Sequence, residues 1–364
     1  MARTQTPLPV LGTTFPLKGG RKLIVFAIAT LLSLFALDVR AQSAADPAHL
    51  TGPDRTAKLI AGAKKEGTLN LYSSAIAEHM NAVGAAFEKK YGVKVVLWRG
   101  ASEEILQRIV TEARGGHFAV DVAETAAPQI VALNREKLLQ EVETPMRAEI
   151  MPGTFIPGEP WLASRLVVFT GAYNTNLIKK ADLPKRYEDL LDPKWKGKLA
   201  IEADDNNWLM AISGALGEEK GIKLFRDIVA KNGISVRKGH TLMANLVASG
   251  EVPIALTVYH HEVAPLKRAG APIDEIDIAP VFAFAAGAGM AKRAPHPYAA
   301  MLFIDFLLSD GQKILAEHDN VPASVKYAAL PKDMKLLFLD VPKYMDESAK
   351  WTKLYKDTLL NQKR

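Results

Sequence analysis

Over residues 54–140, segments in which apolar residues have helical spacing alternate with short apolar runs. This pattern predicts helices that alternate with strands. Apolar side chains about four residues apart indicate a helix from Ile76 to Tyr91, and short apolar runs on either side of it indicate strands. The remaining elements expected here are strands at 69–72, 93–98 and 118–123 and helices at 54–66, after an N-cap at Ser102, and at 128–139. Strands that alternate with helices at short spacing favour a parallel sheet with helices on both faces.

A second series begins at the run RLVVFTGAYNT (165–175), which predicts a long strand. The elements expected after it are helices at 187–191, 208–216, 222–232, 241–248 and 299–308, strands at 199–203 and 252–259, an extended segment at 276–286 and a Lys-rich helical tail. We therefore predict an α/β protein of two lobes around a cleft, the first interrupted in sequence by the second. Lobe I comprises 42–172 and 273–364 with the C-terminal helices, and lobe II comprises 173–272. The crossing segments are expected near Tyr173 and over 272–280.

The N-terminal residues 1–41 have the order of regions that is typical of a cleavable secretory signal. Basic residues come first, the apolar run 23–37 follows, and the small residues Val39 and Ala41 stand at the −3 and −1 positions of a cleavage site. A membrane anchor is the alternative, but this run is shorter than the roughly 20 apolar residues that span a bilayer. We expect cleavage after Ala41 and a periplasmic protein.

Composition narrows the function classes once the signal is removed. Residues 1–41 hold five of the 46 Lys and Arg residues and one of the 40 acidic residues, so 41 bases and 39 acids remain, a net charge of +2. This balance gives no basic footprint for nucleic acid. The remaining 323 residues favour two domains. Cysteine is absent from the sequence, so disulfides and thiolate metal sites are excluded and any metal would be held by oxygen and imidazole.

Catalytic motifs with a fixed spacing are missing from the sequence. It contains no G-x-S-x-G elbow, Walker loop, H-E-x-x-H motif or dinucleotide-binding glycine fingerprint, and Gly287 with Gly289 forms only a lone G-A-G. We expect no enzyme and no cofactor. Eight histidines and many serines leave an exported α/β transferase or hydrolase as the alternative from a different class.

Polar residues at predicted strand ends and helix starts are the candidates for ligand contact, because open α/β sheets bind ligands beyond the carboxyl ends of their strands. The candidates are Ser73, Ser74, Ser102, Thr125, Asp205, Thr241, Tyr259, His260 and His261. The alternative for Ser73, Ser74, Ser102 and Thr241 is a helix N-cap, and Asp205 is more typical of a cap than of a ligand contact.

The run Tyr259-His260-His261-Glu262 is the sharpest of these clusters. A phenol, two imidazoles and a carboxylate at the end of an apolar strand are costly unless they are exposed or bonded. Both histidines reach one site only if the strand has ended before them, and exposed loop histidines are the alternative. Tyr259, His260 and His261 are the candidate metal ligands, and a histidine pair would make ligand capture sensitive to pH near 6–7.

Four segments carry a resemblance to a known family: AKKEGTLNLYSS (63–74), AYNTNLI (172–178), LPKRYEDLLDPKWKGKLAI (183–201) and HPYAAMLFIDFLLSDGQKILAEHDNVPA (296–323). In this order they resemble the periplasmic substrate-binding proteins of ferric-iron-type ABC transporters. The resemblance implies a type II periplasmic-binding fold, closure of two lobes on a small ligand, and docking of the closed form on an inner-membrane permease. A monomer is expected. Presentation to a sensor kinase would share every one of these features.

The sequence departs from that family at its ligand residues. Ferric members carry two adjacent tyrosines after a strand that begins G-E-V, and these positions fall on His260 and His261, with Tyr259 one place early. Fe(III) favours phenolate and carboxylate oxygen, whereas imidazole suits Zn, Cu, Ni or Fe(II). The expected ligand is a metal ion, iron included, or a metal chelate. A small charged organic solute is the alternative, since a helix N-terminus at Ser74 or Thr241 suits an anionic group.

Overall fold

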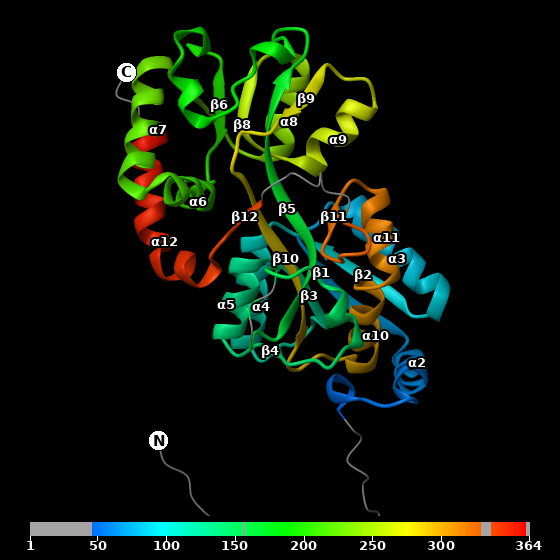
Figure 1. The fold of residues 1–364 in the computed structure, drawn as a ribbon. Helices are drawn as coiled ribbons and strands as arrows, with labels where there is room; N and C mark the ends of the chain where they lie inside the picture. The colour runs from blue at the N-terminus through cyan, green and yellow to red at the C-terminus, as the bar shows by residue number, and fades with distance from the viewer. Residues whose placement is uncertain (1–45, 155, 157, 329–335, 362–364) are drawn as a thin grey trace, which may run out of the picture. The chain divides into compact units, whose positions relative to one another are not determined.

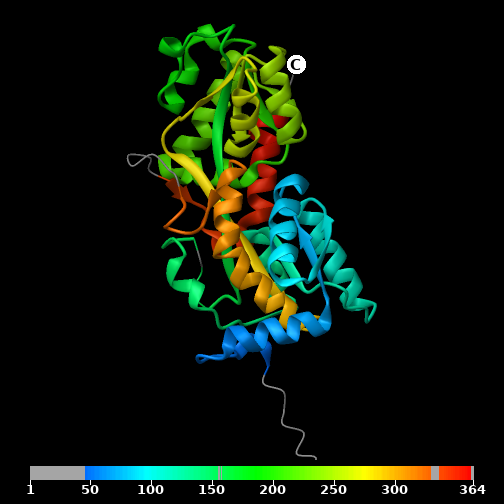
Figure 2. The same cartoon turned by 90° about the vertical axis from the view of Figure 1, so that its right-hand side faces the viewer.

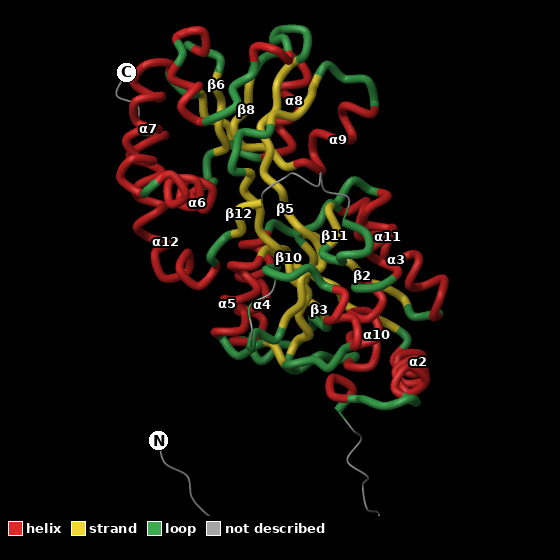
Figure 3. Tube along the Cα trace, in the orientation of Figure 1, coloured by secondary structure: helices red, strands yellow, loops and turns green. Residues whose placement is uncertain are grey.

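The computed structural model describes residues 46–154, 156, 158–328 and 336–361, so the predicted signal at 1–41 lies outside the described residues. Three stretches of elements follow one another along the chain (Figures 1 and 3). The first comprises η1 (Pro47–His49), α2 (Arg55–Glu66), β1 (Thr68–Ser73), α3 (Ala77–Tyr91), β2 (Lys94–Arg99), α4 (Ser102–Arg114), β3 (Val122–Ala126), α5 (Ala127–Arg135), β4 (Leu139–Gln140) and η2 (Pro145–Glu149).

The long strand β5 (Trp161–Asn174) leads into the second stretch. It comprises η3 (Lys180–Asp182), η4 (Tyr187–Leu191), η5 (Pro193–Trp195), β6 (Leu199–Glu202), α6 (Asn206–Leu216), α7 (Glu218–Asn232), β7 (Ser235–Arg237), α8 (His240–Ser249), β8 (Ile254–Tyr259), α9 (His260–Arg268) and β9 (Ile273–Ile276). The third comprises β10 (Val281–Ala291), α10 (Pro297–Leu307), α11 (Asp310–Glu317), β11 (Val321–Pro322), β12 (Leu336–Phe338), α12 (Val341–Tyr355) and η6 (Lys356–Leu360).

The strands form one hydrogen-bonded path in the order β2-β1-β3-β10-β5-β8-β6-β7, and β5 divides it into two parts. Residues 161–168 of β5 pair with β10, whereas residues 169–174 pair with β8 and β9. Strands β1, β2 and β3 are parallel to one another, as are β6, β7 and β8. Strand β10 is antiparallel to both β3 and β5, so the sheet is mixed where a parallel one was predicted.

Helices cover both faces of each part of the sheet, as the βα alternation predicts. In the first part, α10 packs against α2 and α3 on one face, while α4 and α5 pack against each other and against β3 on the other (Figures 1 and 2). In the second part, α8 and α9 contact β5 on one face, and α6, α7 and the C-terminal α12 pack together. Within the described residues, no helix is both long enough and apolar enough to span a bilayer.

Several element boundaries differ from the predicted ones for local reasons. Strand β3 begins at Val122 and not at Phe118, because pairing with β1 starts at Leu71 and Val122. The helix expected over 128–139 ends at Arg135, since Leu139 is needed to pair with Ala291 of β10.

The crossing and the C-terminal helix also differ from expectation. Strand β5 changes partners between Val168 and Phe169, a few residues before Tyr173. Helix α12 was predicted with lobe I, and it packs against α6 as well as against α5. Its buried Tyr355 donates a hydrogen bond to the carbonyl of Glu202 at the end of β6. The rest of the lobe assignment stays a prediction.

Candidate functional site

A pocket of about 340 Å³ lies where the two parts of the sheet meet. Its lining residues are Ser74, Ser102, Ala126, Arg165, Val167, Tyr259, His261, Phe284 and Ala286. Ser74 follows β1, Ser102 opens α4, and Tyr259 with His261 stands at the junction of β8 and α9. The carboxyl ends of strands and the starts of helices therefore surround the pocket, as an open α/β sheet predicts.

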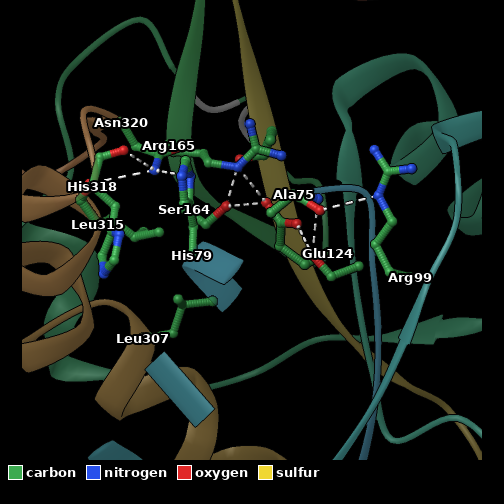
Figure 4. Close-up of polar contacts among 12 residues, drawn as sticks. Ala75, His79, Arg99, Glu124, Ser164, Arg165, Leu307, Leu315, His318 and Asn320 are labelled. Carbon is green, nitrogen blue, oxygen red and sulfur yellow. Dashed lines mark hydrogen bonds and ion pairs between the residues drawn. The ribbon is translucent and has the colours of Figure 1, made fainter. Parts of the chain in front are cut away.

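A buried glutamate organises the floor beneath this pocket. Glu124 of β3 is fully buried, and its carboxylate accepts hydrogen bonds from Ser73 Oγ at 2.6 Å, Ser164 Oγ at 2.9 Å and Arg165 Nε at 3.1 Å (Figure 4). Side chains of β1 and β5 are thus both bonded to one carboxylate of β3. A buried charge is tolerated when it is paired and its oxygens are bonded, and both conditions hold here.

A β-bulge explains how two consecutive residues of β5 reach the same carboxylate. Arg165 pairs with Ala286 and Ala163 pairs with Gly287, so Ser164 is an extra residue on β5. In a regular strand, neighbouring side chains point to opposite faces, whereas a bulge redirects one of them. Ser164 and Arg165 therefore both approach Glu124.

Arg165 brings a positive charge to the pocket wall. It is only 4% exposed, and its Nε donates a hydrogen bond to Glu124. The two Nη groups remain as donors for a ligand. A planar guanidinium suits carboxylate or phosphate groups because it can donate two parallel hydrogen bonds.

Aromatic rings gather around Tyr259, which also lines the pocket. Tyr259 stacks on His240 with ring centroids 3.6 Å apart and on His261 with centroids 5.3 Å apart. Burial, followed by the charge of Arg165, holds the pKa of His261 well below its ordinary value of 6.5. Burial, followed by the carboxylates of Asp205 and Glu202, raises the pKa of Tyr259 well above 10. The pocket without a ligand thus holds a neutral imidazole and a protonated phenol.

The structure separates the two neighbouring histidines. The strand ends at Tyr259 as the hypothesis required, but His260 Nδ1 lies 2.7 Å from Glu275 Oε1 and His260 is not part of the pocket lining. The hydrogen bond to Glu275 raises the pKa of His260 while that of His261 is lowered. The expected joint response of the pair near pH 6–7 is therefore replaced by two shifts of opposite sign.

Of the other predicted residues, Ser73, Thr125 and Thr241 are not part of the pocket lining. Ser73 is buried beneath it on Glu124, and Thr125 is buried on β3. Thr241 donates to Glu262 at 3.0 Å in an exposed position. Ser102 does line the pocket, but it is the first residue of α4 and not its N-cap, because Ala101 occupies that position.

Asp205 belongs to a separate cluster with Glu202 and His240. One ligand atom of each lies within 4.8 Å of the others, and this is the one group of three or more such side chains in the described residues that is spaced to share an ion. The predicted metal ligands Tyr259, His260 and His261 are outside it. Burial lowers the pKa of His240, but the carboxylates of Asp205, Glu202 and Glu262 together raise it more, so the net shift is upward.

Arg165 and Glu202 are absent from the predicted set of site residues. The sequence feature that could have indicated them is a charged residue next to an apolar strand segment, in RLVVF at 165–169 and in LAIE at 199–202. A second cavity of about 420 Å³ lies between α4 and the loop before β3, among Ile109, Phe118 and Leu138. It touches one part of the sheet alone, so it does not match the position expected for the ligand of a two-lobed protein.

Comparisons with known proteins place this geometry in a family. A model of the bacterial extracellular solute-binding proteins matches residues 73–314, about two thirds of the chain. The Fe(3+)-binding periplasmic protein of Serratia marcescens is 27% identical over 284 residues, which cover 73% of this chain and 83% of that protein.

Solved structures share the fold. Iron-bound HitA from Pseudomonas aeruginosa superposes with a TM-score of 0.68 at 24% identity, covering 80% of this chain and 99% of that one. The periplasmic binding protein AfuA from Actinobacillus pleuropneumoniae, with fructose-6-phosphate bound, gives a TM-score of 0.69 at 23% identity, covering 80% and 98%. The α/β architecture, the pocket between two parts of one sheet and the family match agree with a binder and not with an enzyme. This chain belongs to the bacterial extracellular solute-binding proteins.

Proposed function

We propose that the protein is the periplasmic solute-binding component of an ABC importer and that it captures a metal ion carried as a complex with a small oxyanion. The observation that carries this proposal is the pocket that joins Arg165, two serine hydroxyls, Tyr259 and His261. The similarity to iron-binding periplasmic proteins supports the metal, and the pocket chemistry supports the accompanying anion.

The anion is supported by one side of the pocket. Arg165 offers its Nη donors, and Ser74 and Ser102 offer hydroxyls near the N-terminal ends of α3 and α4. A helix N-terminus favours negative charge because its first backbone N–H groups lack intrahelical partners. A bare cation would be repelled by the guanidinium, whereas a metal chelated by carboxylate or phosphate groups would present oxygens to it.

The metal is supported by the other side. The depressed pKa of His261 keeps its imidazole neutral and able to donate a lone pair. The Tyr259 phenol can become a ligand only if it loses its proton, which a metal of high charge promotes by stabilising the phenolate. His261 is therefore the first metal ligand that we assign, with Tyr259 as its partner.

A small organic anion without metal is the second candidate, because Arg165 and the two serines would recognise it equally well. Both ligands would act through the same closure. The proposed lobes are joined at β5 and at residues 277–280, and a ligand that contacts both lobes favours the closed form by its differential affinity. The closed form would then deliver the ligand to the permease.

Calorimetric titration of the protein without its signal separates these candidates. The probes are ferric citrate, citrate alone and inorganic phosphate. We expect ferric citrate to bind tightly and His261→Ala to weaken it about 10- to 100-fold, the loss of one strong polar contact. His260→Ala is the matched control and should bind as the wild type does. Tight binding of citrate or phosphate without iron favours the second candidate. Failure of all three probes to bind, or equal affinity in His261→Ala, contradicts the proposal.

A further inference from the structure

A second group of potential metal ligands lies at the carboxyl end of β6, apart from the pocket lining. Glu202 is the last residue of β6, Asp205 immediately precedes α6, and His240 is the first residue of α8. The chain brings them together because the parallel strands β6 and β7 end at the same edge, where α6 and α8 begin. Glu202 and Asp205 are each 5% exposed.

Asp205 is placed as an N-cap but does not act as one. Aspartate at this position normally accepts a hydrogen bond from a backbone N–H of the first helical turn. Here its side chain makes no such bond; Oδ1 lies 3.3 Å from His240 Nε2, and the buried Oδ2 has no hydrogen-bond partner. A buried carboxylate oxygen without a partner is costly, so a cation in contact with it would be stabilising.

The side chains of Glu202 and His240 are also held in position, close to Asp205. The Glu202 carboxylate accepts the backbone N–H of Gly239 at 2.9 Å and that of Asp204, which fixes both of its oxygens. The His240 ring is held by stacking on Tyr259, and its Nε2 lies 3.3 Å from Asp205 Oδ1. Ligands that are oriented by their surroundings before the metal arrives bind it more tightly.

Distance and charge favour a divalent ion. In a tetrahedral site with bonds of about 2.0–2.1 Å, neighbouring ligand atoms are about 3.3 Å apart. Asp205 Oδ1 and His240 Nε2 are already at that separation, and one ligand atom from each of the three side chains lies within 4.8 Å of the other two. Two carboxylates and a neutral imidazole carry two negative charges, which a divalent cation balances.

We propose that Glu202, Asp205 and His240 bind a divalent transition-metal ion such as Zn²⁺, at a site separate from the ligand pocket. One imidazole and two carboxylates are ligands that suit Zn²⁺ and Fe²⁺. All three come from residues 202–240, within the predicted lobe II, so this ion would not depend on closure. Its link to the pocket is the His240 ring, which the ion would hold against Tyr259.

Zinc titration of the chelator-treated protein tests the site. The background is His261→Ala, which removes the metal ligand that we assign in the pocket. We expect one Zn²⁺ per chain by calorimetry and by native mass spectrometry, and a visible absorption spectrum of tetrahedral type with Co²⁺. Asp205→Asn and His240→Gln should each weaken Zn²⁺ binding at least about 100-fold, since each removes a direct ligand.

Asp204→Asn is the matched control, because it removes a neighbouring carboxylate whose side chain is 74% exposed. It should bind Zn²⁺ as the background does. Circular dichroism melting of each variant without metal reports folding, and Zn²⁺ should raise the Tm of the background protein but not that of Asp205→Asn or His240→Gln. Absence of stoichiometric Zn²⁺ and Co²⁺ binding, or equal affinity in the background and both ligand variants, overturns the proposal. Neither result bears on ferric citrate binding by the wild type.

Discussion

At the scale of single residues, two neighbouring side chains reach different surroundings because a helix begins at the first of them. His260 and His261 follow one strand end, yet one bonds to Glu275 and the other lines the pocket. Sequence reasoning placed both in one site, and what separates them is the start of α9 at His260. Successive residues of a helix point about 100° apart, so the two rings leave the backbone in different directions.

The shifted pKa of His261 has a consequence for stability. Its value is lowered by burial and by Arg165, so the unfolded chain takes up a proton near pH 6.5 while the folded protein does not. Because the unfolded state binds more protons, the free energy of unfolding falls as the pH drops below about 6.5. His261→Gln removes this loss. When the pH is lowered from 7.5 to 5, we expect the free energy of unfolding of the variant to rise by up to about 2 kcal/mol relative to that of the wild type.

Urea unfolding at the two pH values measures that difference. His240→Gln is an informative comparison, because the raised pKa of His240 has the opposite sign. Protonated His240 stabilises the folded protein below pH 6.5, and this stabilisation is lost as the pH rises through the folded pKa. His240→Gln should therefore be less stable than the wild type at pH 5. A His261→Gln difference that does not change with pH would contradict the assignment of a buried, neutral imidazole.

At the scale of elements, β5 and β10 position the site and depend on small residues. The G-A-G motif that gave no cofactor signal lies in β10, where Gly287 faces the Trp161 ring and Gly289 faces Leu139. A Cβ at residue 287 would lie 2.3 Å from that ring. These glycines therefore permit close packing next to the β5 bulge, a role that the motif alone did not indicate.

Gly287→Ala tests this packing. The clash with the buried indole should reduce the free energy of unfolding by about 1–3 kcal/mol, the usual cost of overpacking a core. Gly214→Ala is the control: it lies in α6 with open space around its Cβ position, and it should be stabilising by about 0.5–1 kcal/mol through helix propensity. Urea midpoints of the two variants should therefore move in opposite directions. A Gly287→Ala protein as stable as the wild type would rule out the proposed contact.

At the scale of the whole molecule, the two proposed lobes are linked by the backbone at β5 and at residues 277–280, and by side-chain contacts. Arg268 of α9 pairs with Asp319 after α11, but the Arg268 side chain is 63% exposed. Exposed ion pairs contribute little to stability because solvent screens them. We expect the energy for closure to come from the ligand.

Small-angle scattering measures that closure. Ferric citrate at about ten times the wild-type Kd should decrease the radius of gyration of the wild type, whereas His261→Ala at the same concentration should contract less because less of it is bound. His260→Ala should contract as the wild type does. An identical scattering curve with and without a ligand that calorimetry shows to be bound would exclude hinge closure.

The sequence by itself determined many of the elements and their order, because hydrophobic periodicity and capping act between residues a few positions apart, but it did not predict α9 or α11. It predicted α3, β1, β2 and β8 to within a residue or two, and its motifs indicated the family. Tertiary structure alone decided which side chains meet. Glu124 and Arg165 are 41 residues apart, Asp205 and His240 come from different helix starts, and a bulge turned Ser164 toward Glu124. Such contacts depend on strand register and on folding of distant segments against each other, and no local pattern in the chain records either.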